Sequence, residues 1–525
     1  MAVTTGSAEP AEGTNPNIEQ SDNPVESTAD QTLLGTMMTV RDSDAFRTGI
    51  REMTALLGNA ERLLPNIIAP RGERYAQVAG DTRTDGTSAN DVPASEISDE
   101  KRKELKDKYG VDVEVKDGKY IFKSEIAGQH RDVFSSDATP EGMEKAIKAL
   151  DKQEALFKKY GVETYIEDGK YKFTYFVDGQ MRDAIQPVDA TPDAMDKAEQ
   201  NLEAQTQSKI KELEKRYKIS IEPGGREIGS QEDICRPKGD QAGLPKISTR
   251  TPTMGELYAL EQALSQSEPS QLHLPGEKPL SVMFIDKSAA VDRDGNDILR
   301  GVYFPPEVNK GQGVLVITPS GADAPLTDND TKGDEESLAS TIRHELAHNG
   351  QRNLYPKMEV PESTLREMGW IRFPNPDYKP GQLGSQRFNY AIKTTDGRYF
   401  TNSGPSCDNG AGTWNEVNSK GQFLDSNGKI VKDRKDAFEI NNDELRENAL
   451  VKPSTNYFNQ PLEVLAEGMK LFRGGEEGRE ALKNENPELF KIIEKVDELE
   501  RKLRYGVNSN GSAKVQRRPD GTLDR

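Results

Sequence analysis

Two histidines and a glutamate form the short pattern in this chain whose residue types and spacing could carry out chemistry. His344, Glu345 and His348 read as H-E-x-x-H. Residues four apart on an α-helix share a face, so the two imidazoles can bind one ion. Two imidazoles suit Zn²⁺, and a catalytic zinc needs one more protein ligand and an open position for a water. Because Glu345 can deprotonate that water, the pattern predicts metal-assisted hydrolysis.

The residues on either side of this pattern predict the helix that it needs. Asp334 is a candidate N-cap, and Gly350 followed by Pro356 supplies stop signals. Apolar residues recur between these ends at helical spacing: Leu338, Ile342 and Leu346. The alternative is two solvated histidines on an ordinary helix. It is disfavoured because two of the four histidines in the chain fall in this pattern.

A second stretch, residues 457–472, offers the missing ligand. It reads YFNQPLEVLAEGMKLF, with Glu463 and Glu467 four residues apart. Pro461 suits the first turn of a helix, so both carboxylates are expected on one helical face. A solvated acidic stripe is the ordinary alternative. The unfilled position of the metal site favours Glu463 as the third ligand.

H-E-x-x-H followed by a helix bearing E-x-x-A-E resembles the gluzincin metallopeptidases, in particular the family of the anthrax lethal factor catalytic domain. The resemblance spans about residues 252–506. It implies Glu345 as the general base and Glu467 as the acceptor for a ligand imidazole, that of His344. It also implies a tyrosine before the second helix that stabilises the oxyanion, here Tyr457. The zinc ligands that it implies are His344, His348 and Glu463.

The chain as a whole is expected to be a multidomain α+β protein, with a zincin-like metallopeptidase domain preceded by small α/β repeat modules and a disordered N-terminus. The repeat is visible directly, because residues 108–120 recur at 159–171. The expected parts are 1–30 disordered, 31–97 an amphipathic helix (44–64) and linker, 98–222 two and a half αββ-type repeats, 223–250 a linker, 251–506 the peptidase domain with a β-rich insertion at about 370–450, and 507–525 a disordered tail.

Three strands are expected before the H-E-x-x-H helix, at residues 280–285, 301–304 and 314–318. The middle one is the candidate edge strand, which would pair with the extended backbone of a substrate. Its residues are Gly301, Val302, Tyr303 and Phe304. An ordinary buried strand is an equally good interpretation. Two acidic turns, 292–297 and 328–333, lack the bidentate glutamate of a calcium loop and are interpreted as polar turns.

The composition of the chain limits which binding partners and which cellular compartment are expected. A net charge of −19 argues against binding nucleic acid or an anionic membrane through the whole surface. Two cysteines, Cys235 and Cys407, make no disulfide framework in 525 residues. The N-terminus carries no secretory signal. We therefore expect a cytoplasmic protein, or one secreted without a cleavable signal peptide.

The expected function is that of a zinc-dependent endopeptidase with one catalytic Zn²⁺. Its expected partners are a protein or peptide substrate and a protein that binds the repeats, with no nucleic acid and no membrane. The alternative is a non-catalytic binding or scaffold protein that acts through its repeats and carries a degenerate zincin domain. A complete ligand set argues against that alternative.

Overall fold

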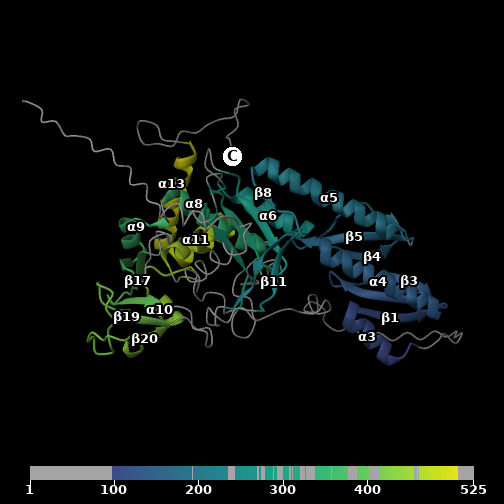
Figure 1. The fold of residues 1–525 in the computed structure, drawn as a ribbon, viewed down its shortest axis with the longest axis horizontal. Helices are drawn as coiled ribbons and strands as arrows, with labels where there is room; N and C mark the ends of the chain where they lie inside the picture. The colour runs from purple at the N-terminus through teal and green to yellow at the C-terminus, as the bar shows by residue number, and fades with distance from the viewer. Residues whose placement is uncertain are drawn as a thin grey trace, which may run out of the picture. The chain divides into compact units, whose positions relative to one another are not determined.

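The protein is a mixed α+β protein with several sheets (Figure 1). The predicted N-terminal helix, both cysteines, both acidic turns, the C-terminal tail and Tyr457 lie outside the residues that the structure describes. Over the described residues, no helix combines the length and the apolar character that crossing a membrane would take. The computed structural model describes residues 97–191, 193–233, 243–268, 271–272, 278–287, 289–291, 300–306, 309, 311–319, 325–326, 337–355, 358–376, 387–402, 413–454, 458 and 460–505.

The repeated sequence folds twice as a helix followed by an antiparallel sheet. Asp117–Gly118 and Asp168–Gly169 turn the first hairpin of each copy, with positive φ at both residues, as in a type I′ turn. The first copy comprises α3 (Asp99–Tyr109), β1 (Val111–Lys116), β2 (Lys119–Ile126) and β3 (Gln129–Asp137). The second comprises α4 (Pro140–Tyr160), β4 (Glu163–Glu167), β5 (Lys170–Val177), β6 (Gln180–Asp183) and β7 (Val188–Asp189), and α5 (Ala194–Tyr217) follows.

A mixed sheet of six strands follows, in the order β14-β15-β12-β11-β9, with β8 also paired to β12. Strand β12 lies parallel to β15, and β14 lies antiparallel to β15 at the end of this order. The strands are β8 (Ser220–Ile221), β9 (Glu227–Ser230), β11 (Lys246–Arg250), β12 (Ser281–Ile285), β14 (Gly301–Phe304) and β15 (Val314–Ile317). A separate parallel pair joins β10 (Glu232–Asp233) to β13 (Ala290–Val291).

The prediction of a linker at residues 223–250 needs correction. Strands β9 and β11 lie in this stretch and pair with each other, and β11 also pairs with β12. The apolar and polar alternation of β11 covers five residues, and Gly and Pro surround it. Such a short signal is hard to distinguish from a loop, because much of the strand's stability comes from its partners in the sheet.

Helices α6 (Met254–Gln266) and α8 (Leu338–Leu354) pack on this sheet through one apolar cluster. Thr253 and Glu256 start α6 with a reciprocal capping box, which satisfies two free N–H groups of its first turn. Leu260 of α6, Phe284 of β12 and Leu346 of α8 belong to the cluster and are almost fully buried. The sheet therefore supports the H-E-x-x-H helix from its apolar face.

A second antiparallel sheet lies in the sequence between α8 and α11, where a β-rich insertion is predicted. It runs in the order β16-β17-β18-β19-β20. Its elements are α9 (Glu362–Glu367), β16 (Trp370–Pro374), β17 (Phe388–Lys393), β18 (Tyr399–Asn402), β19 (Thr413–Val417), the 3₁₀ turn η5 (Arg434–Asp436), β20 (Glu439–Asn441) and α10 (Asn442–Asn448). The C-terminal helices are α11 (Pro461–Arg473), α12 (Glu476–Glu485) and α13 (Pro487–Tyr505).

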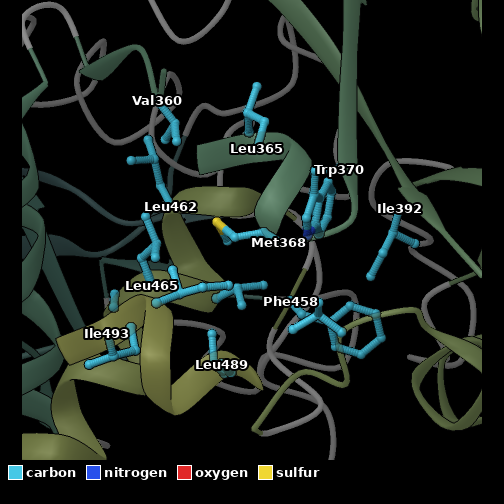
Figure 2. Packing of buried hydrophobic residues seen from close by; sticks show 14 of the residues in the cluster. Val360, Leu365, Met368, Trp370, Ile392, Phe458, Leu462, Leu465, Leu489 and Ile493 are labelled. Atoms are coloured by element: carbon cyan, nitrogen blue, oxygen red, sulfur yellow. The ribbon is translucent and has the colours of Figure 1, made fainter. Parts of the chain in front are cut away.

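The apolar face of α11 belongs to a second core, in which it meets α9, β16 and α13 (Figure 2). Leu465 is 1% exposed in this core, which also contains Leu489 and Ile493 of α13. We expect Leu465→Ala to lower the free energy of unfolding by about 2–5 kcal/mol, because it leaves a cavity. Urea denaturation measures the change.

The matched control is Leu499→Ala on α13, where the side chain is 45% exposed. This change should stay within about 0.5 kcal/mol of the parent protein. Equal effects of the two substitutions would contradict the packing assigned to α11.

Candidate metal centre

The H-E-x-x-H helix begins and ends at other residues than predicted. Ser337 is the N-cap of α8, and its hydroxyl accepts a hydrogen bond from the Ser340 backbone N–H at 3.0 Å. Asp334 lies outside the described residues. The helix continues through Gly350 to Leu354, so the glycine is not a stop. A Cβ at Gly350 would collide with the Glu500 carboxylate of α13, so this glycine permits close packing instead.

Helix α11 carries both predicted glutamates on the side that meets α8. Pro461 begins the helix, where its missing N–H has no partner to lose. Glu463 and Glu467 are buried, as are His344 and His348 on α8. Helices α8 and α11 are in direct contact. Ionisable side chains are rarely buried unless they are paired, so this burial itself indicates a constructed site.

Three ligand atoms converge between the two helices. The Glu463 Oε2 atom lies 3.2 Å from His344 Nε2 and 3.3 Å from His348 Nε2. The two Nε2 atoms lie 3.1 Å apart. Donor atoms around a tetrahedral zinc ion, with bonds of about 2.0–2.1 Å, lie roughly 3.3 Å from one another. His344, His348 and Glu463 therefore form a buried group that could hold a metal ion, the one such group found among the described residues.

The other ring nitrogens of the two histidines face acceptors. Glu467 Oε1 lies 2.7 Å from His344 Nδ1. Gln351 Oε1 lies 3.1 Å from His348 Nδ1. With protons on both Nδ1 atoms, each Nε2 presents a lone pair toward the Glu463 carboxylate. Three acceptors then face one another, and a cation, or a proton in its place, is needed between them.

Lys470 is a buried member of the site that sequence reasoning missed. Its Nζ lies 2.8 Å from Glu467 Oε2 and 3.0 Å from Glu467 Oε1. Burial alone would raise the pKa of Glu467, but Lys470 and His344 lower it overall. The available signal was the Glu–Lys spacing of three, which on most helices marks a weak pair at the surface. Here the pair holds the carboxylate ionised against a ligand imidazole.

The three ligand side chains perturb one another strongly. Burial alone would lower the pKa of His344, but Glu463 and Glu467 raise it well above its ordinary value. The pKa of His348 is raised as well, because Glu463 outweighs the effect of burial. Burial opposes ionisation of Glu463, but the two histidines lower its pKa to about 2. In the metal-free protein, the imidazoles of His344 and His348 therefore retain protons that a metal ion must displace.

Zinc should stabilise the protein more at about pH 8 than at about pH 6. A raised histidine pKa stabilises the metal-free fold below the unfolded value of about 6.5, and this stabilisation is lost as the pH rises through the raised pKa. Zinc binds neutral imidazoles, so its affinity rises over the same range. We expect the difference in Tm between zinc-loaded and chelator-treated protein to widen with pH.

Glu463→Ala serves as the control for this measurement and should show little zinc-dependent shift at either pH. A difference in Tm that is equal at the two pH values, or larger at the lower one, would contradict the assignment of protons to these imidazoles.

Glu345, the predicted base, is buried against strand β14. A Cβ at Gly301 would lie 3.0 Å from Glu345 Cγ, so a side chain at this position would force Glu345 to shift. The backbone N–H of Tyr303 donates a hydrogen bond to the Glu345 carboxylate. Burial raises the pKa of Glu345 from its ordinary value. A raised pKa brings a carboxylate closer to the range in which a base is effective near neutral pH.

The candidate edge strand has the predicted bounds and lies at the end of the sheet order as β14. Thr318 N–H donates to Arg300 C=O, so in the antiparallel register the backbone groups of Gly301 and Tyr303 face away from β15. All four side chains, Val302 and Phe304 included, are buried. The Tyr303 hydroxyl donates to Asn349 Oδ1 on α8 at 2.5 Å. Contact of this strand with a substrate stays a prediction.

Comparisons of the chain with protein-family models, with curated proteins and with solved structures find no match. The resemblance to gluzincins therefore depends on the residues of α8 and α11.

Proposed function

We propose that this protein is a zinc-dependent endopeptidase of the gluzincin type that hydrolyses peptide bonds in protein substrates. The observation that carries the proposal is the convergence of His344, His348 and Glu463, with Glu345 next to the first ligand on the same helix. Two imidazoles and one carboxylate suit zinc and leave a position for water. This set is complete, so a degenerate domain that acts only as a scaffold is the weaker proposal.

His344, His348 and Glu463 would hold the ion. When bound, zinc supplies a Lewis acid that polarises the scissile carbonyl and lowers the pKa of a water. Glu345 would take the proton of the attacking water and deliver it to the leaving amine. The Tyr303 N–H keeps the Glu345 carboxylate in place for both steps. Tyr457 is proposed to donate to the oxyanion.

The remaining chain would position these groups and the substrate. Lys470 and Glu467 hold His344, and Gly301 lets β14 lie against Glu345. We propose that an extended substrate backbone adds to the outer side of β14, whose place at the end of the sheet order supports this mode. We further propose that the repeats bind a protein partner, and that neither nucleic acid nor a membrane is a ligand of this acidic chain.

The decisive test is cleavage profiling of the purified full-length chain against a mixed peptide library, with its zinc content measured in parallel. We expect cleavage within peptides, loss of cleavage after chelation and its return on addition of zinc. A protein that holds one zinc per chain but cleaves no peptide or protein in such a screen would overturn the proposal.

A further inference from the structure

Both the oxygen and the nitrogen of one buried side-chain amide make hydrogen bonds at the metal centre. Gln351 lies on α8, three residues after His348, and is 1% exposed. Its Oε1 atom lies 3.1 Å from His348 Nδ1. Its Nε2 atom donates to the backbone carbonyl of Leu462 at 3.0 Å. Leu462 directly precedes Glu463, so this amide joins the second histidine ligand to the backbone that carries the carboxylate ligand.

The contacts determine which way the amide points. The Leu462 carbonyl can only accept a hydrogen bond, so the NH₂ group of Gln351 must face it. The amide oxygen then faces His348 Nδ1, which must be the donor. This tautomer leaves His348 Nε2 with its lone pair toward Glu463 Oε2, 3.3 Å away.

We propose that Gln351 is a positioning residue of the metal centre. It sets the tautomer and ring orientation of His348 and holds that ring in register with Glu463. This inference rests on the proposed function in so far as the ion held there is the catalytic one.

The chemistry of the site favours a neutral amide at this position. Glu463, Glu467 and Glu345 already place three buried carboxylates around the two imidazoles. A carboxylate at position 351 could accept from His348 but would set a second negative oxygen against the Leu462 carbonyl. The amide supplies an acceptor to one partner and a donor to the other. The two histidines are therefore held differently, His344 by a carboxylate and His348 by an amide.

Gln351→Met and Gln351→Glu separate these contributions. Methionine has a similar length and makes neither hydrogen bond, so zinc should bind about 10–100-fold more weakly. Glutamate keeps the acceptor for His348 but loses the donor to the Leu462 carbonyl, so its zinc Kd should lie between those of the parent chain and the methionine variant. Competition with a chromophoric chelator measures both Kd values on the full-length chain. The visible spectrum of the cobalt-substituted protein reports ligand geometry and should change in the methionine variant.

The matched control is Gln153→Met in the second repeat helix, α4. Gln153 is also buried, and its amide donates to the Val133 carbonyl at 2.8 Å. Loss of this bond should leave zinc affinity and the cobalt spectrum unchanged. If Gln351→Met does not fold, the zinc Kd of the Gln351→Glu variant still tests the inference.

A methionine variant that binds zinc within about twofold of the parent chain, with the same cobalt spectrum, would overturn the inference. So would a glutamate variant whose zinc affinity falls as far as the methionine variant is expected to fall. None of these readouts requires peptide hydrolysis. A chain whose zinc affinity depends on Gln351 but that cleaves nothing would therefore reject the proposed function and keep this inference.

Discussion

Glu345→Gln should leave zinc bound and reduce kcat/KM for peptide hydrolysis by about 10²–10⁴-fold, the range that a positioned acid–base group contributes. The amide has the shape of the carboxylate and can still accept from the Tyr303 N–H. It cannot take a proton from water. Because Glu345 is not one of the converging ligands, the metal should remain. Steady-state kinetics on a peptide taken from the cleavage screen, with elemental analysis of the same sample, measures both quantities.

The control for this experiment is Glu498→Gln on α13, where the side chain is 65% exposed and pairs with Lys502 one turn along the helix. Its kcat/KM should equal that of the parent chain. Full peptidase activity in a zinc-loaded Glu345→Gln protein would rule out Glu345 as the base and leave the mechanism without its proton carrier.

Glu463→Ala should remove zinc from the protein at concentrations that saturate the parent chain. Removing a side chain that hydrogen-bonds to a metal ligand typically weakens metal affinity about 10–100-fold. Removing the ligand itself should weaken the affinity more. It also leaves the His344 and His348 imidazoles facing each other without the carboxylate between them. Zinc-dependent activity should be lost together with the metal. Chelator competition and elemental analysis measure the affinity and the zinc content.

A graded series makes this prediction sharper. Glu467→Gln keeps all three ligands but removes the charge that faces His344 and pairs with Lys470, so its zinc affinity should fall less than that of Glu463→Ala. Glu477→Ala, an exposed glutamate of α12, should have no effect. Stoichiometric zinc in Glu463→Ala would show that another group completes the site and that α11 does not supply the ligand.

The two ligand helices could be predicted because their signals are local. H-E-x-x-H needs only the helical spacing of His344 and His348, and Pro461 with the apolar side of α11 indicates the second helix. The candidate ligands followed from residue chemistry. The ends of α8 were predicted less well, since Gly350 serves a contact with Glu500 of α13 that no local pattern contains. Strands β9 and β11 were missed for the same reason, because their partners in the sheet lie elsewhere in the chain.

By itself the sequence determined which residue types could bind and use a metal, because ligand chemistry and helical periodicity are properties of short segments. Only the tertiary structure decided that Glu463 meets the histidines. The packing of α8 on α11 also buries Lys470 beside Glu467 and aims Gln351 at His348. Glutamine and lysine on a helix are ordinarily solvated. Their roles here depend on burial and on the packing of α8 against α11, which brings Gln351 to the Leu462 carbonyl more than a hundred residues away and Glu467, the partner of Lys470, to His344.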